Sequence, residues 1–120
     1  MKPGVEGQFR EHCRHIGRWG GRIATLIGQG SFEEFRGDEA THLAVWKCVE
    51  VVGEEAFRIL KLDRDFEDRY PQLQLRRAYV LRNQLAQDRV AVDLGVLWTT
   101  ATTFVPHLVA EANAIAGEAD

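Results

Sequence analysis

The chain has 120 residues, of which 45% are hydrophobic and 28% charged, and its formal net charge is −3. This length suits one ordinary domain, and the composition excludes disordered and fibrous proteins. Mild acidity also excludes a protein that holds nucleic acid through bulk positive charge, so any phosphate contact must come from a local group of cations.

Several features favour a reducing cytoplasm and no membrane contact. Cys13 and Cys48 have no paired spacing of the kind seen in disulfide-linked secreted folds. The first seven residues hold no apolar stretch that could serve as a signal peptide. The longest uncharged run, 94–110, is shorter than the roughly 20 apolar residues of a membrane span and contains Pro106 and His107. We therefore expect a cytoplasmic protein.

Apolar residues recur at helical spacing along the first half of the chain. The pattern predicts a helix over 8–27 with one apolar face, formed by Phe9, Cys13, Ile16, Gly20, Ile23 and Ile27. Ser31 and Glu34 fit a capping box that opens a short helix ending by Gly37. Asp38 can cap the next helix, over 38–60, which carries two neighbouring stripes. The first is Val45, Val49, Val52, Ala56 and Ile59, and the second is Leu43, Trp46, Gly53, Phe57 and Leu60. A helix that is apolar on two faces should be central.

The second half predicts three more helices. A charge-rich helix over 63–70 breaks before Pro71, and another over 74–88 buries Leu75, Ala78, Leu81 and Leu85. Asp93 caps a last helix, in which Pro106 removes a donor, so we expect a bend near Thr102. Its seam is Leu94, Trp98, Ala101, Val105, Leu108, Ala112 and Ile115. We therefore expect residues 1–120 to form a single all-α domain, a bundle of four to five helices.

A histidine cluster lies on the first predicted helix. His12, Cys13 and His15 carry side chains that bind zinc, and Cys48 or His42 could complete a set of ligands. On a helix, however, Cys13 points about 100° away from His12. We expect a buried thiol flanked by surface histidines, with no metal and no cofactor.

Two groups of arginines are candidates for an anion site. The first helix carries a line of four, Arg10, Arg14, Arg18 and Arg22, for which we favour a solvated face balanced by Glu6 and Glu11 over a phosphate-binding or partner-binding role. The second group is Arg76, Arg77, Arg82 and Arg89. No Lys or Arg follows from Val90 onward, and this asymmetry indicates that one end of the bundle faces an anion.

The order of several short motifs resembles the HepT family of HEPN-domain toxins over about 9–116. In chain order the motifs are 31–35 (SFEEF), 49–56 (VEVVGEEA), 69–71 (RYP), 82–85 (RNQL) and 92–94 (VDL), followed by Trp98. The resemblance implies a homodimer of HEPN-like antiparallel helices. In active members an arginine and a histidine on one helix pair across the dimer as a metal-independent ribonuclease. A base removes the ribose 2′-hydroxyl proton while the arginine stabilises charge on the phosphate.

The chain departs from this family pattern at two positions. Arg82 and Asn83 are present, but Gln87 occupies the histidine position. Arg89 occupies the position of a tyrosine that a minimal nucleotidyltransferase antitoxin adenylates in the family. Glutamine has no proton that titrates near neutral pH, and loss of a general base typically removes about 10²–10⁴ in rate. The resemblance thus implies a toxin–antitoxin protein whose ribonuclease activity is attenuated or absent.

The candidate catalytic residues are accordingly Arg82 and Gln87, and the candidate RNA or phosphate ligands are Arg82, Asn83, Arg89 and Arg77. Two alternatives stay open. One is a non-catalytic helical dimer that binds nucleotide, RNA or a protein such as the nucleotidyltransferase. In the other, Arg82 and Arg89 merely pair with Glu50, Glu54 or Asp88 to hold helices together. Large apolar residues favour the homodimer, namely Trp19, Trp46, Trp98, Leu97 and Phe104.

Overall fold

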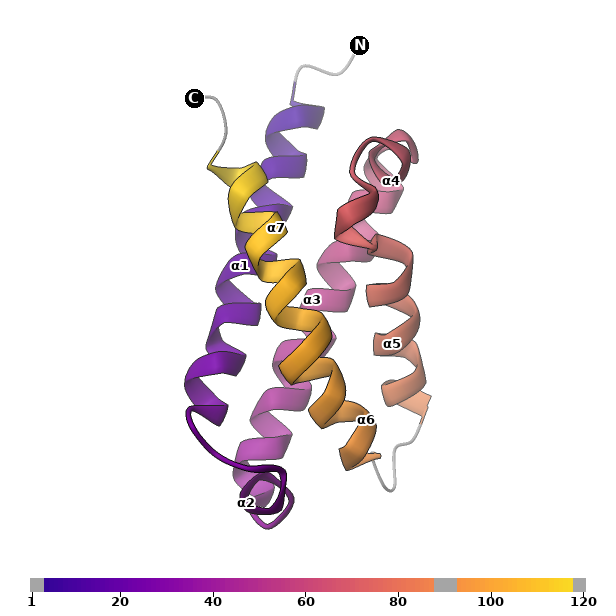
Figure 1. The fold of residues 1–120 in the computed structure, drawn as a ribbon. Coiled ribbons are helices and arrows are strands. Elements are labelled where there is room, and N and C mark those ends of the chain that lie inside the picture. Colours follow the sequence, from indigo (N-terminus) through magenta and orange to yellow (C-terminus); the bar gives the residue numbers. More distant parts are fainter. Residues whose placement is uncertain (1–3, 88–92, 118–120) are drawn as a thin grey trace.

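The computed structural model describes residues 4–87 and 93–117, and all regular structure within these ranges is helical (Figure 1). The elements are α1 (Val5–Ile27), α2 (Phe32–Arg36), α3 (Glu39–Leu62), α4 (Asp65–Arg69), the 3₁₀ turn η1 (Pro71–Leu73), α5 (Leu75–Gln87), α6 (Leu94–Thr99), the π turn η2 (Thr100–Phe104) and α7 (Val105–Ala116). Successive long helices run in opposite directions, which confirms the expected all-α antiparallel bundle. None of the described helices combines the length and apolar character needed to cross a bilayer.

Side-chain caps fix the starts of three helices where the sequence predicts them. The Ser31 hydroxyl accepts from the Glu34 amide while the Glu34 carboxylate accepts from the Ser31 amide, a complete capping box. Asp38 accepts from the amide and hydroxyl of Thr41, and these hydrogen bonds hold the pKa of the Asp38 carboxyl below its ordinary value. Asp93 accepts from the Val96 amide at 3.0 Å. These caps satisfy amides that the first helical turn leaves unpaired.

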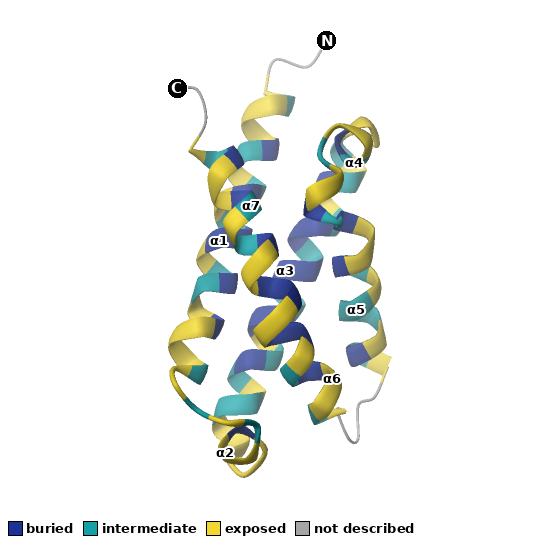
Figure 2. Ribbon diagram, in the orientation of Figure 1, coloured by how far each residue is buried: buried dark blue, intermediate teal, exposed yellow. Residues whose placement is uncertain are grey.

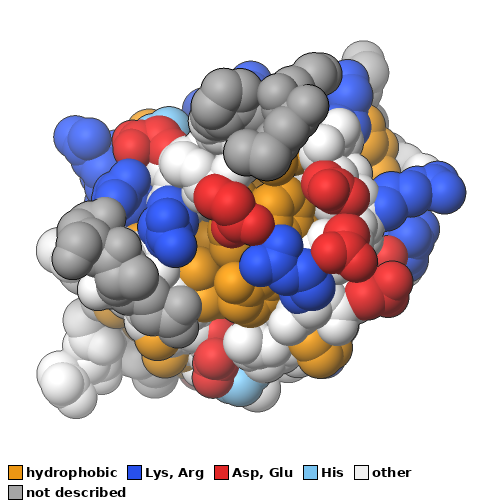
Figure 3. All heavy atoms as spheres, turned by 90° about the horizontal axis from the view of Figure 1, so that it is seen from above, with side chains coloured by type: hydrophobic (Ala, Val, Ile, Leu, Met, Phe, Trp, Pro, Cys, Tyr) orange, Lys and Arg blue, Asp and Glu red, His pale blue; other side chains and the backbone are white. Residues whose placement is uncertain are grey.

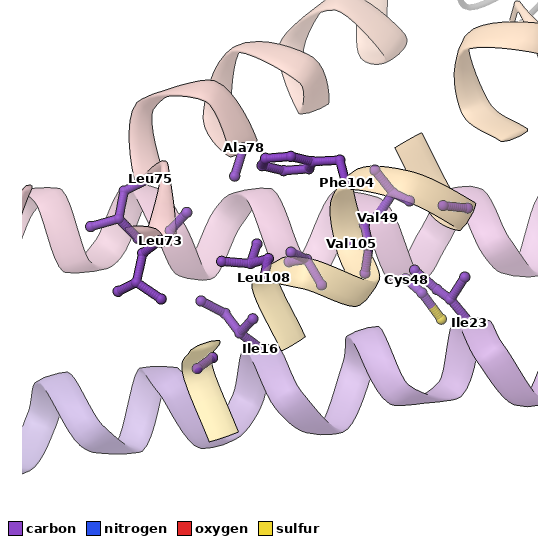
Figure 4. Close-up of a cluster of buried hydrophobic side chains, with 14 of the residues drawn as sticks. Ile16, Ile23, Cys48, Val49, Leu73, Leu75, Ala78, Phe104, Val105 and Leu108 are labelled. Atoms are coloured by element: carbon purple, nitrogen blue, oxygen red, sulfur yellow. The ribbon is translucent and has the colours of Figure 1, made fainter. Parts of the chain in front are cut away.

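The core forms around α3, which packs against α1 on one side and α5 on the other, while α7 packs on α1 (Figure 2). The first predicted stripe of α3, which includes Val49 and Val52, is buried along its whole length. In Figure 4, Ile16 and Ile23 of α1 approach this stripe together with Val105 and Leu108. The second predicted stripe is only partly buried. The prediction that Leu43, at its start, faces the core is wrong, because 59% of this residue is exposed near the beginning of α3.

A π turn interrupts the last helix at the place where the sequence predicts a bend. The Val105 amide donates to the Thr100 carbonyl, one residue beyond the α-helical partner, and the Thr102 hydroxyl donates to the Trp98 carbonyl at 2.7 Å. The extra residue shifts the buried face before it. Leu97 is therefore completely buried, and Trp98, expected in the seam, is half-buried against Phe35.

The π turn also changes the argument for a dimer, because Leu97 and Phe104 are buried inside the protomer and all three tryptophans are half-buried. The apolar surface expected to drive dimerisation is mostly used within one chain. That reason for a homodimer is therefore wrong, and the homodimer stays a prediction.

One end of the bundle is closed by aromatic rings beneath an ion pair. Phe9 of α1 stacks on Phe66 of α4 with ring centroids 4.2 Å apart, and Tyr70 lies beside them. Arg69 covers the rings and donates to Glu6 at 2.9 Å. Figure 3 shows apolar side chains in the middle of this end, with charged side chains around them. Glu6 is thus the counter-charge of Arg69, whereas the sequence predicted that it balances the arginines of α1.

The core packing predicts a large cost for a cavity at Leu108, which is fully buried on α7. The Leu108→Ala substitution should lower the free energy of unfolding by about 2–5 kcal/mol, because lost burial and an unfilled cavity add. Urea unfolding followed by circular dichroism measures this. The matched Leu43→Ala substitution, at an exposed leucine, should change it by less than about 0.5 kcal/mol. Equal effects of the two substitutions would contradict the packing described here.

Candidate functional site

Arg82 emerges at the closest approach of α3 and α5. A Cβ atom on Gly53 would lie 2.3 Å from the Cβ of Arg82 and 2.8 Å from its Cγ. Real Cβ contacts are longer, so only glycine permits this distance between the two helices. The base of the Arg82 side chain is therefore pressed against the backbone of α3, and its direction is set by helix packing.

Neighbouring side chains hold the guanidinium of Arg82, whose side chain as a whole is 28% exposed. Its Nη1 donates to Asn83 Oδ1 at 2.9 Å, and its Nη2 lies 3.5 Å from Glu54 Oε2. The Nε atom is buried with no hydrogen-bond partner among the described residues. A guanidinium has five N–H donors, so these two contacts leave donors for a ligand. The interhelical ion pair that the sequence offered as an alternative is thus present with Glu54, whereas Glu50 pairs with Lys47.

Gln87 is the last residue of α5 and is exposed. Five residues along an α-helix correspond to a rotation of roughly 140°, so Arg82 and Gln87 project in different directions from one protomer. The histidines lie elsewhere: His12 and His15 are beside Glu55, His42 packs on Phe35, and His107 is exposed on α7. Within the part of the chain that the structure describes, no imidazole is found in contact with Arg82.

Arg77 lies on another side of α5 from Arg82. Its guanidinium stacks 4.8 Å from the centre of the Phe104 ring and donates to Gln74. It borders a cavity of about 500 Å³ whose other lining residues include Thr100 and Asp93. Arg76 is engaged by both carboxylate oxygens of Glu67, at 3.0 Å each. Arg76, Arg77 and Arg82 therefore do not form one patch within a protomer.

Arg89 and Asp88 lie outside the described residues, so their predicted roles remain predictions from the sequence.

The arginine line on α1 has local partners. Arg14 donates to Glu11 at 2.9 Å, and Arg22 stacks on the Trp19 ring at 4.2 Å. These contacts fit the solvated face that the sequence favours.

The histidine cluster of α1 is joined to α3 through Glu55, a partner that the sequence analysis did not identify. The Glu55 carboxylate is almost buried and lies 2.5 Å from His12 Nδ1 and 3.3 Å from His15 Nδ1. The sequence considered Cys48 or His42 as third groups, whereas the structure brings Glu55. The sequence spacing could have indicated that Glu55 is buried, because it follows Val52 by three residues and precedes Ile59 by four and so lies within the buried stripe. Cys13 faces the core instead, and burial raises the pKa of its thiol to about 12.

These features define a class of protein: a small helical bundle that presents an arginine, braced by an asparagine and a glutamate, at the contact of two antiparallel helices. Comparison with known proteins gives the family. The sequence matches the family described as "Ribonuclease HepT-like" over residues 20–115, most of the chain. The chain belongs to this HepT-like family, as its motifs indicate.

Curated relatives agree with this assignment. The chain is 30% identical over 80 residues to "Putative RNase MJ0125" of Methanocaldococcus jannaschii, covering 67% of this chain and 66% of that protein. It is 32% identical over 77 residues to "Probable ribonuclease HepT" of Thermococcus cleftensis, covering 64% and 67%. It is 29% identical over 93 residues to "Putative RNase MJ0127" of M. jannaschii, covering 78% and 74%. The chain thus spans slightly less than two thirds of the first of these relatives. No solved structure matches the sequence.

The close contact at Gly53 predicts that the packing of α5 against α3 requires a glycine at this position. The Gly53→Ala substitution should lower the free energy of unfolding by about 1–3 kcal/mol, because the new methyl group forces the helices apart. Gly21→Ala is the matched control on α1, since a Cβ atom there would meet nothing within 4 Å and alanine favours a helix by about 1 kcal/mol. Thermal unfolding of both variants measures the difference, and a Gly53→Ala protein as stable as the control would contradict the close approach.

Proposed function

We propose that this protein is the HepT-like component of a toxin–antitoxin module that binds RNA through Arg82 and has attenuated ribonuclease activity. The observation that carries the proposal is the state of Arg82. It is half-buried, directed by the Gly53 contact, and retains donors beyond those used by Asn83 and Glu54. Such a cation suits a phosphate, because a fixed guanidinium offers planar pairs of donors.

We expect attenuated ribonuclease activity because the family chemistry has two parts, charge stabilisation and proton transfer, which depend on different residues. Arg82 supplies stabilisation of the charge that builds on the attacked phosphate. The proton of the 2′-hydroxyl needs an acceptor, and Gln87 cannot take it at neutral pH. Gln87 can orient a hydroxyl or bind a phosphate oxygen, so the site retains binding while losing most of the rate.

A homodimer is part of this proposal. Arg82 and Gln87 diverge by roughly 140° around α5, so one protomer does not direct both at one phosphate. A symmetric pair of α5 helices brings the Arg82 of each chain toward the Gln87 of the other, which supplies a composite cleft.

Restoring the family residues should restore cleavage. We expect the Gln87→His and Arg89→Tyr double substitution to raise the rate of RNA cleavage by about 10²–10⁴ over the natural chain, because a general base returns. Gel assays with single-stranded and structured RNA in EDTA measure the rates. Adding Arg82→Ala to the double variant is the control and should abolish the gain. A natural chain that already cleaves as fast as the double variant would contradict the attenuation.

RNA binding without cleavage tests the role of Arg82 directly. The Arg82→Ala substitution should weaken binding and reduce the slope of log affinity against log salt by about one, because one phosphate contact is lost. Arg36→Ala is a control of equal charge, since Arg36 is exposed on α2 and pairs with Glu33. If both substitutions weaken binding equally, only the net charge matters and Arg82 has no special role.

Arg89 favours a second candidate function, a non-catalytic partner of a minimal nucleotidyltransferase. Arginine at this position removes the adenylate acceptor and adds a cation. Mixing the chain with a minimal nucleotidyltransferase and labelled ATP distinguishes the roles. Stable complex formation without labelling, and labelling only of an Arg89→Tyr variant, supports the binding role. Labelling of the natural chain would contradict the loss of the adenylate acceptor.

A further inference from the structure

We propose that His12, His15 and Glu55 form a binding site for Zn²⁺ or a neighbouring first-row divalent cation. Each residue offers one ligand atom, and the three atoms lie within 4.8 Å of one another. Both imidazoles come from successive turns of α1 and the carboxylate comes from α3. A cation at their centre would connect the two helices.

The burial of Glu55 is the first argument. Its side chain is only 9% exposed, in the contact between two helices that otherwise meet through apolar residues. A buried carboxylate is costly unless cations or donors surround it. The groups within reach are the two imidazoles and, at 4.0 Å, the Arg58 guanidinium. A divalent cation bound by the imidazoles would supply positive charge directly beside this carboxylate.

The orientation of His15 is the second argument. Its Nδ1 faces Glu55 at 3.3 Å, while its Nε2 lies 3.2 Å from Glu11 Oε1. Histidines that bind metals commonly donate their other ring N–H to a carboxylate, which fixes the tautomer and the ring orientation. Glu11 already occupies the position of that second carboxylate beside His15. Nδ1 of His15 is thereby left as the metal-binding nitrogen, next to Nδ1 of His12.

The donor set selects the class of cation. Two imidazole nitrogens and one carboxylate oxygen suit zinc and its first-row neighbours, whereas magnesium and calcium prefer oxygen ligands alone. Three protein ligands leave a fourth position open, as in catalytic zinc sites. His15 is 40% exposed, so a cation can reach the cluster from solvent.

The site is separate from the proposed RNA site. Glu54 faces Arg82 and Glu55 faces the histidines of α1, so the two clusters point about 100° apart around α3 and have different ligands. Arg58 lies within 4.0 Å of both carboxylates. His12 and His15 also precede residues 20–115, which match the HepT-like family.

Cobalt titration of the untagged, metal-stripped full chain tests the proposal. Co²⁺ should give visible ligand-field bands that saturate at one ion per chain, and Zn²⁺ should abolish them. No near-ultraviolet band from sulfur is expected, because Cys13 and Cys48 are buried. The half-exposed position of His15 makes His15→Gln the variant least disruptive to folding, and it should weaken Co²⁺ binding at least about tenfold. The matched His107→Gln variant changes an exposed histidine on α7 and should bind as the natural chain does.

Thermal unfolding gives a second readout. Zn²⁺ should raise the melting temperature of the natural chain and of His107→Gln, and should not raise that of His15→Gln. The absence of cobalt bands, or equal titrations of the two histidine variants, would overturn the site. Because the RNA assays described above contain EDTA, failure here leaves the proposed function intact, and failure there leaves the metal site intact.

Discussion

The burial of α3 between α1 and α5 is the constraint on which both candidate sites depend. Its apolar stripe fixes the rotation of the helix about its own axis, since Val49, Val52 and Ala56 must face the core. Consecutive residues then point about 100° apart. Glu54 is thereby turned toward Arg82 on α5 and Glu55 toward the histidines on α1. One apolar register thus places two carboxylates in two different chemical settings.

Belonging to the HepT-like family does not by itself determine what the chain can catalyse. In the proposed function, stabilisation of charge on the phosphate rests on Arg82, whose position depends on Gly53 and on interhelical packing. Proton transfer would rest on the identity of one exposed residue at the end of α5, which packing does not constrain. A substitution there would change the proposed chemistry at little cost to stability, so a binding role is compatible with an intact bundle.

Much of the fold could be predicted from the sequence, because its determinants are local. Ser31, Asp38 and Asp93 mark helix starts through their own capping bonds, and the spacing of apolar residues reveals the inner face of α3. Leu43 was predicted incorrectly because periodicity does not show where a helix extends past its neighbours. Glu55 was missed as a partner of His12 because the pairing of α1 with α3 depends on tertiary packing, which no local pattern reports.

The π turn in the last helix has a consequence for the length of the chain. It holds one residue more than a regular α-helical turn needs, and that residue sets the phase between α6 and α7. A deletion of one residue in 100–104 would remove this extra residue and with it the π turn. The same deletion would rotate Leu97 by about 100° relative to Leu108, out of the interior. The number of residues here therefore matters more than their identity, and shortening by one would be more harmful than most replacements.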